Sequence, residues 1–239
     1  MNKSQEYLSE KANLSDTLLN YIDEEGNTEK NLANLTILIE DQHIKEDRNE
    51  FKFLLTIISN ISCNRHRKSH FFAKIETLLK MHKDEIEKYY TNREIYDIFH
   101  ESKRVLLFLI NEKLITIDNY ILNDFFSYRK EKNNYPQYFL PEIKLINTSL
   151  INREKNEFQI PENFEELRLN GENESQLCEI IRKDDLNEFI RFIEQRSIPL
   201  DYKIETSIYE TNLYLNNYKS HSYLYDTKKE LIYYVAYFN

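Results

Sequence analysis

The chain of 239 residues contains only two glycines and four prolines, and it has no tryptophan. Glycine supplies the positive φ angles of phosphate-cradling loops, dinucleotide-binding turns and tight β-hairpins, so its scarcity disfavours all three architectures. Helices joined by turns that carry Asn and Asp are the natural alternative. We therefore predict an all-α fold with no cofactor bound in a glycine-rich loop.

The chain also has only two cysteines, Cys63 and Cys178, which lie far apart in sequence. They form no disulfide framework, which predicts a reducing, cytoplasmic compartment. The first 15 residues lack the apolar segment of a signal peptide. The longest aliphatic run, residues 105–110, is far shorter than the roughly 20 residues needed to span a bilayer, so we expect no membrane partner.

The balance of charge is acidic, with 41 acidic residues against 32 basic ones and a net charge of −9. Nucleic-acid binding requires Lys and Arg to replace the counterions of the phosphates, so we expect no nucleic-acid partner. Hydrophobic residues make up 41% of the chain, which is too many for a disordered protein. The composition therefore predicts a folded protein with a sizeable core.

Apolar residues recur at helical spacing along the chain. They predict helices over residues 14–22, 32–45, 49–62 and 68–90, the last with a break near residues 83–84. Residues 93–118 predict a helical hairpin followed by a short return, with Ser102 capping the second helix. Residues 127–165 contain three of the four prolines, which predicts an irregular connector. We divide the chain into N-terminal helical hairpins (1–126), this connector (127–165) and a C-terminal helical module (166–239).

The predicted hairpin recurs when residues 95–121 are shifted by 83 positions. Helix pairs with weak self-similarity are typical of an α-solenoid. The alternative is that any two amphipathic hairpins share a period of 3.6 residues, but this does not explain the matching return and its aspartate. The matched pairs are Ile95 with Cys178, Ile98 with Ile181, Leu106 with Phe189, Leu107 with Ile190, Ile110 with Ile193, Ile115 with Ile198, Ile117 with Leu200 and Asp118 with Asp201.

Three segments carry a resemblance to a known family. They are FEELRLNGENESQLCEIIRKDDLNEFI (164–190), IETSIYETNLYL (204–215) and ELIYYVAYFN (230–239). They resemble the domain of unknown function that precedes divergent ankyrin repeats in trichomonad-type protozoan ankyrin-repeat proteins. IFHESKRVLLFLINEKLITID (98–118) and YPQYFLPEI (135–143) are similar to an earlier region of the same family. The resemblance covers about residues 90–239.

The resemblance implies an ankyrin-like helical module, and for the family it implies protein recognition on a concave surface. The final helix of the family's pattern ends in A-A-F-F-G, where this chain has residues 235–239, VAYFN. Asn239 thus stands where the family has glycine, and no ankyrin array follows it. We therefore expect the module of residues 166–239 to be incomplete at its C-terminus.

Two clusters near residue 65 have possible chemistry. Cys63, His66 and His70 form C-x2-H-x3-H, a spacing at which Cys and His can bind zinc. A second Cys at C-x2-C spacing is absent, so we expect a loop-to-helix junction and no metal site. The other cluster is basic, and on an acidic chain it is more typical of a solvated face or a docking spot than of a nucleic-acid site. It comprises Arg65, His66, Arg67 and Lys68.

Local chemistry around Gly171 suggests structural roles more than catalytic ones. Paired carboxylates can act as a general acid and base, but here they lie in a charged turn, so we expect solvated charges. These carboxylates are Glu165, Glu166, Glu172 and Glu174. Gly171 itself is expected to end a helix in the left-handed conformation.

Four residues that follow Gly171 also have expected structural roles. Asp184 and Asp185 are expected to cap the helix that begins at Leu186. Arg182 is expected to pair with an acidic neighbour, and Cys178 to behave as a small buried hydrophobe.

The function that we predict is a non-catalytic, intracellular protein–protein interaction module of the ankyrin-repeat type. The final helix would present the interacting side chains, either to a protein partner or to a second copy of the chain. These are Leu231, Ile232, Tyr234, Val235 and Phe238. The alternative is a small enzyme on an α-scaffold, which would need a pocket with convergent polar groups. The sequence shows no such set, and we assign no catalytic, cofactor-binding or metal residues.

Overall fold

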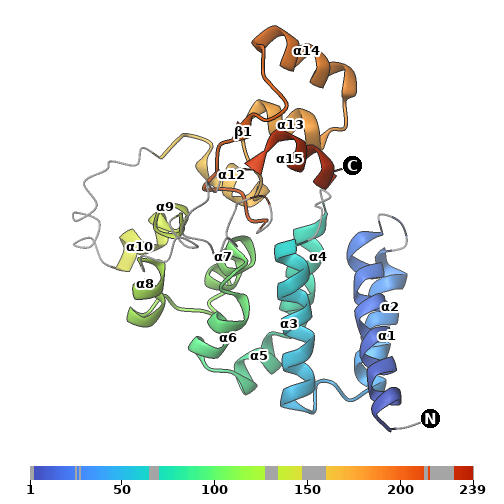
Figure 1. The fold of residues 1–239 in the computed structure, drawn as a ribbon. Helices are drawn as coiled ribbons and strands as arrows, with labels where there is room; N and C mark the ends of the chain where they lie inside the picture. Colours follow the sequence, from blue (N-terminus) through green and yellow to red (C-terminus); the bar gives the residue numbers. More distant parts are fainter. Residues whose placement is uncertain are drawn as a thin grey trace.

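The computed structural model describes residues 3–24, 26, 28–64, 70–126, 134–146, 160–212, 215 and 229–238 (Figure 1). Over these residues the chain is helical apart from one short strand pair, which confirms the predicted all-α class. Helical hairpins stand side by side from α1–α2 to α6–α7, and a C-terminal unit lies across one end of α4 and α7.

The N-terminal part contains helices α1 to α10. Their bounds are α1 Lys3–Asp23, α2 Thr28–Asp41, α3 Arg48–Asn64, α4 Phe71–Met81, α5 Lys83–Tyr89, α6 Asn92–Phe99, α7 Lys103–Asn111, α8 Asn119–Phe125, α9 Tyr135–Tyr138 and α10 Leu140–Ile146. The predicted helix over 14–22 is the second half of the longer α1. The predicted break near residues 83–84 lies at His82, between α4 and α5.

One hydrophobic core holds these helices together, from Leu14 on α1 to Ile143 on α10. The segment predicted as an irregular connector contributes to it, because Tyr135, Tyr138 and Phe139 are buried there. Part of that segment is therefore helical, as α9 and α10. The rest of the predicted connector, apart from residues 160–165, lies outside the described residues.

The C-terminal unit has a smaller core of its own, which extends from Leu177 to Tyr234. It consists of α12 Phe164–Asn170, α13 Gln176–Arg182, α14 Leu186–Arg196, β1 Lys203–Ile204, β2 Lys229–Glu230 and α15 Leu231–Phe238. The strands are antiparallel, with Lys203 opposite Glu230. They bring α15 back against α13. As expected, α14 begins 83 residues after α7.

At three helix ends in this glycine-poor chain, a residue other than glycine adopts the left-handed conformation. His43, Lys113 and Ser197 have φ angles of 52°, 62° and 51°. In each case the next residue, which is apolar, donates its N–H to a carbonyl five residues earlier, the bond of a Schellman motif. These bonds run from Ile44 to Ile39 (3.1 Å), from Leu114 to Leu109 (2.9 Å) and from Ile198 to Ile193 (2.9 Å).

Cationic side chains from distant elements cap several helix ends. The carbonyls at a helix C-terminus carry partial negative charge, so Lys and Arg stabilise them. Each such bond also ties two elements together. The donors and acceptors are Lys74 Nζ to Tyr21 O (2.7 Å), Arg48 Nε to Tyr89 O (3.1 Å), Lys83 Nζ to Glu112 O (3.2 Å), Arg104 Nε to Leu169 O (3.0 Å) and Arg168 Nη1 to Tyr138 O (2.9 Å).

Candidate interaction site

The C-terminal unit is anchored where α12 ends. Gly171 has a φ of 67° and is the left-handed C-cap of α12, as predicted. Both the backbone N–H and the hydroxyl of Thr211 donate to the Gly171 carbonyl, at 3.1 and 3.0 Å. A Cβ at position 171 would lie 3.2 Å from the Thr211 hydroxyl oxygen. Glycine is therefore required here by both conformation and space.

Segments 171–175 and 205–212 form a buried network of hydrogen bonds. Asn173 donates from its amide to the Glu205 carbonyl (2.9 Å) and from its backbone N–H to Glu210 Oε2 (3.2 Å). The other oxygen of Glu210 accepts the N–H of Asn212 at 2.8 Å. The Ser207 hydroxyl donates to Glu174. Several residues that carry the family resemblance thus bind each other, which gives them a structural role.

Helix α15 is attached to α13 by a buried polar contact. Arg182 Nη1 donates to the Tyr234 hydroxyl at 3.1 Å, and Arg182 Nε pairs with Glu172 at 2.9 Å. This ion pair confirms the acidic neighbour predicted for Arg182. Burial raises the pKa of the Tyr234 hydroxyl and of the adjacent Cys178 thiol, so both stay protonated at neutral pH. Cys178 is a free, buried cysteine, as expected, and its thiol is a poor nucleophile.

The last turn of α15 is also held by hydrogen bonds to segment 205–212 and to the end of α3. The Tyr237 hydroxyl accepts a hydrogen bond from the Asn212 amide (2.5 Å) and donates to the Asn64 carbonyl at the end of α3 (3.0 Å). The inner face of the helix is therefore covered by the chain itself.

This placement corrects the predicted set of interacting residues. Leu231 and Tyr234 are buried in the C-terminal core, so they are unavailable to a partner. Val235 and Phe238 are partly buried and pack against the same core. Ile232 alone of the five is well exposed, at 53% of its surface. The physical reason is that α13 and segment 205–212 supply the cover that sequence analysis assigned to a partner.

Tyr233 belongs to the tyrosine-rich end of the chain but not to the predicted set, and it is 63% exposed. The spacing of residues 231, 234 and 238 places them on one face of a helix, with residues 232, 233 and 236 on the opposite face. Helix α15 has no charged residue, LIYYVAYF, so its outer face is apolar and aromatic. A helix that is apolar all round is normally buried on every side.

Helix α14 leaves a second apolar face uncovered. Its inner side presents Phe192 to the C-terminal core, whereas Leu186 and Ile190 are 66% and 40% exposed. Leu200, in the return that follows, is exposed as well. The helix starts as predicted, because Asp185 Oδ1 accepts the N–H of Glu188 at 2.9 Å. Asp184 makes no such cap and instead occupies the preceding turn with a φ of 52°.

The four carboxylates near Gly171 do not converge. Glu165 pairs with Arg168 at 2.7 Å, Glu172 with Arg182, and Glu174 accepts from Ser207. Glu166 is exposed. Three of the four therefore each bind a different structural partner.

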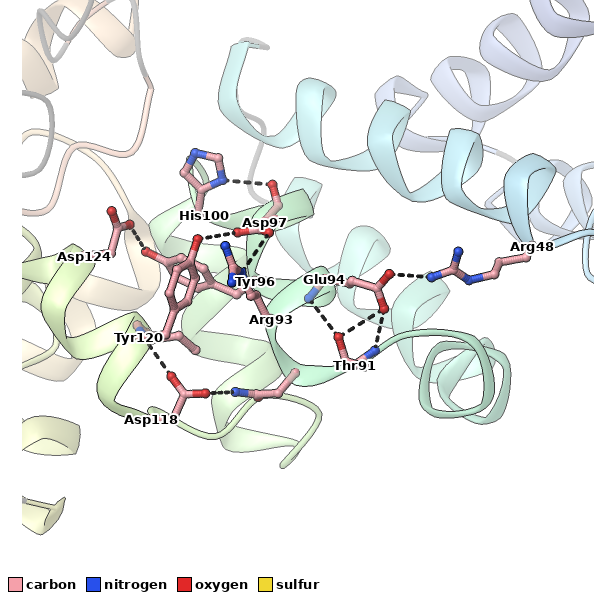
Figure 2. Close-up of polar contacts among 12 residues, drawn as sticks. Arg48, Thr91, Arg93, Glu94, Tyr96, Asp97, His100, Asp118, Tyr120 and Asp124 are labelled. Carbon is pink, nitrogen blue, oxygen red and sulfur yellow. Dashed lines mark hydrogen bonds and ion pairs between the residues drawn. The ribbon is translucent and has the colours of Figure 1, made fainter.

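A polar network on α6 and α8 was not expected from the sequence (Figure 2). The Tyr96 hydroxyl donates to Asp124, and the Tyr120 hydroxyl donates to Asp97 Oδ1 at 3.2 Å. The Arg93 guanidinium lies 4.1 Å from the centroid of the Tyr120 ring. Burial raises the pKa of Tyr96, so its phenol remains a donor. The network joins two helices by directional contacts, and its groups are already paired with each other.

Two further contacts in the same view fix the ends of α6 and α8. Thr91 and Glu94 form a capping box, and Glu94 also pairs with Arg48. The Thr91 backbone N–H and the Arg48 guanidinium lower the pKa of Glu94 to about 2. Asp118 caps α8 by accepting the N–H of Ile121 at 3.0 Å. Ser102, in contrast, stands at the start of α7 without the predicted side-chain cap.

The structure describes Cys63 and His70 of the possible zinc ligands, and it describes none of the basic cluster. Cys63 is buried at the end of α3 and His70 directly precedes α4. His66, and with it the cluster of residues 65–68, lies outside the described residues. Among the residues that the structure describes, no three His, Cys, Asp or Glu side chains are grouped closely enough to hold a metal ion.

No helix in the described part of the chain is both long and apolar enough to cross a membrane. Comparison with known proteins found no matching family model, no matching curated protein and no matching solved structure. The resemblance to the ankyrin-associated domain therefore stays a prediction.

Proposed function

We propose that this chain is a non-catalytic protein–protein interaction module that recognises a protein through the outer faces of α14 and α15. The proposal includes an ankyrin-like arrangement of helical hairpins and an intracellular, cytoplasmic location. The single observation that carries it is the charge-free helix α15, whose inner face is buried while Ile232 and Tyr233 point outward.

The chemistry of these faces fits recognition of a protein. Contact residues at protein interfaces are enriched in aromatic side chains, because Tyr offers a large area at low entropic cost. The Leu231 N–H donates to the Tyr202 carbonyl at 2.7 Å, which places the exposed Tyr202 next to the start of α15. Leu186, Ile190 and Leu200 are exposed on α14 and in the return that follows it, and Tyr202, Ile232 and Tyr233 are exposed around the start of α15.

Three observations support the ankyrin-like arrangement and the cytoplasmic location that the proposal includes. The hairpins α6–α7 and α13–α14 have the same helix order, and α7 and α14 begin 83 residues apart, as a repeat requires. Several residues of the family resemblance, in segments 171–175 and 205–212, bind each other. The two cysteines are buried and form no disulfide with each other, which suits a reducing compartment. An enzyme would need a concave set of catalytic groups, and nothing among the described residues favours that alternative.

The test is the double variant Ile232→Lys with Tyr233→Lys. Both residues are exposed, so the fold should persist while two positive charges are placed on the apolar face. We expect a protein retained by the immobilised wild-type chain in a cell extract to be lost from the double variant. Self-association, measured by sedimentation velocity, should be lost in the same way if the partner is a second copy.

Leu8→Lys is the matched control, because Leu8 on α1 is 66% exposed and lies outside the C-terminal unit. It should behave as the wild type in both measurements. If the double variant retains the same proteins and the same sedimentation behaviour as this control, the proposed surface is wrong.

A further inference from the structure

A second candidate site lies at the opposite end of the chain, between α1 and α2. The two helices pack as a hairpin at the edge of the molecule (Figure 1), and a groove with a volume of about 300 Å³ runs between them. Its lining is Asn13, Thr17, Asn20, Asn31, Asn34, Ile37, Leu38 and Asp41. This volume is at the lower end of the range for ligand sites, roughly 300–1,000 Å³.

The sequence positions this groove beside the core. On α1, residues 13, 17 and 20 each directly precede a buried residue, namely Leu14, Leu18 and Tyr21. On α2, residues 34 and 38 precede the buried Leu35 and Ile39. Successive helical residues are about 100° apart, so the lining forms a stripe next to the buried face of each helix. The stripes of the two helices therefore meet along the hairpin.

Four of the eight lining residues are asparagines, whereas about one residue in nine is asparagine in the whole chain. A carboxamide offers a donor and an acceptor side by side, which is the same pair that a peptide unit presents. Asp41 is the charged member of the lining, which opposes an anionic ligand. The lining has no aromatic ring on which a sugar could stack. Its chemistry therefore favours an uncharged peptide main chain.

Three of the amides are available to a ligand. Asn31 is held in place, because its Nδ2 donates to Glu24 Oε2 at 2.7 Å. The side chains of Asn13, Asn20 and Asn34 are exposed and form no hydrogen bond with other described residues. Ile37 is also exposed and adds an apolar contact at the groove.

The spacing of these groups suits an extended chain. Asn13 and Asn20 are seven residues apart on one helix, which corresponds to about 10 Å. An extended peptide advances about 3.3 Å per residue, so the groove spans about three residues. We propose that the groove between α1 and α2 binds an extended, uncharged peptide segment through its main chain, with asparagine amides as the donors and acceptors and Ile37 as the apolar contact.

The experiment uses a library of capped, uncharged heptapeptides, screened against the full chain by fluorescence polarisation. Peptides that bind should lose affinity by roughly 5- to 150-fold with the double variant Asn13→Ala and Asn34→Ala, because each of the two lost hydrogen bonds contributes about 0.5–1.5 kcal/mol. Alanine favours the helix, so this variant should fold. The matched control is Asn119→Ala with Asn187→Ala, which removes two exposed amides from α8 and α14 and should leave binding unchanged.

Three results would each overturn the proposal. The first is that no library peptide binds with a Kd below about 1 mM. The second is that peptides N-methylated along the backbone bind as well as their parents, since recognition would then not involve the main chain. The third is that maltohexaose, and no peptide, shifts the side-chain amide NMR signals of the groove asparagines. The C-terminal variant at positions 232 and 233 leaves this groove intact, so the two proposals can fail separately.

Discussion

The hairpins α6–α7 and α13–α14 share a local design but differ in their surroundings. Helix α7 packs against α4 and α6, its Lys103 Nζ lies 5.0 Å from the centroid of the Tyr138 ring on α9, and its residues 103–109 are all buried. Helix α14 packs on α13 and leaves most of its surface exposed. Leu107 is 1% exposed, whereas Ile190, its counterpart 83 residues later, is 40% exposed. The same apolar pattern therefore forms a core in one place and a surface in the other.

The largest expected effect compares these two counterparts directly. Leu107→Ala should lower the free energy of unfolding by about 2–5 kcal/mol, because it leaves a cavity in a closely packed core. Ile190→Ala should lower it by less than about 1 kcal/mol, since water already reaches that side chain. Urea denaturation of both variants measures the difference. Equal losses would mean that α14 is covered in solution, and the comparison would fail.

The next largest expected effect is that acid destabilises the N-terminal core, which contains His82, and not the C-terminal core. His82 is buried between α4 and α5, with its ring 5.7 Å from that of Phe51. Burial is the main cause that lowers its pKa to about 4, with Lys45 acting in the same direction and Glu85 opposing. The unfolded chain takes up a proton below pH 6.5, while the folded chain does so only near pH 4. Stability should therefore fall between these values, by about 3 kcal/mol at the most.

The comparison variant for this effect is His82→Leu, which keeps an apolar side chain in the site but cannot titrate. The difference in unfolding free energy between the wild type and this variant should change between pH 6.5 and pH 4 and be constant above pH 7. The C-terminal unit has no histidine among residues 160–212 and 229–238, so it should not contribute to this difference. A difference that is constant across the whole range would contradict the buried, neutral His82.

A third test compares the first residues of α7 and α14, which are Lys103 and Leu186. Lys103 is buried, its Nζ donates to the Ile208 carbonyl at 2.6 Å, and it lies 5.0 Å from the centroid of the Tyr138 ring. Lys103→Met should cost about 1–2 kcal/mol, because the carbonyl loses a charged donor while the apolar stem is kept. Leu186→Lys, the reverse exchange at the exposed counterpart, should cost nothing measurable in thermal unfolding. A stable Lys103→Met variant would show that the buried charge is not needed there.

Local features of the fold could be predicted from the sequence. Gly171 ends α12 in the left-handed conformation, Asp185 caps α14, and the break before α5 lies one residue from its expected place. Each depends on residues within one turn of helix. Helical period predicted α3 from residue 49, and the structure begins it at residue 48.

Contacts between distant segments could not be predicted in this way. Lys103 and the carbonyl that it binds are 105 residues apart, and Arg168 reaches Tyr138 across 30 residues. Nothing in either neighbourhood indicates the partner. The candidate interaction site was misjudged for the same reason, because the burial of Leu231 and Tyr234 depends on how α13 and segment 205–212 fold over them. The helical period of α15 divides its residues between two faces, but it does not indicate which of the two faces is exposed.

The smallest expected effect concerns a feature that the two hairpins share despite their different burial. Lys113 after α7 and Ser197 after α14 both hold the left-handed conformation, which costs an L-residue other than glycine about 1 kcal/mol. Lys113→Gly and Ser197→Gly should each stabilise the fold by about 0.5–1 kcal/mol, in chemical denaturation, with similar gains at both ends. The reverse exchange, Gly171→Ala, should destabilise, because its Cβ would crowd Thr211. Similar gains would show that helix termination is set locally even where packing differs, whereas a gain at one end alone would show that the surrounding core also determines how the helix stops.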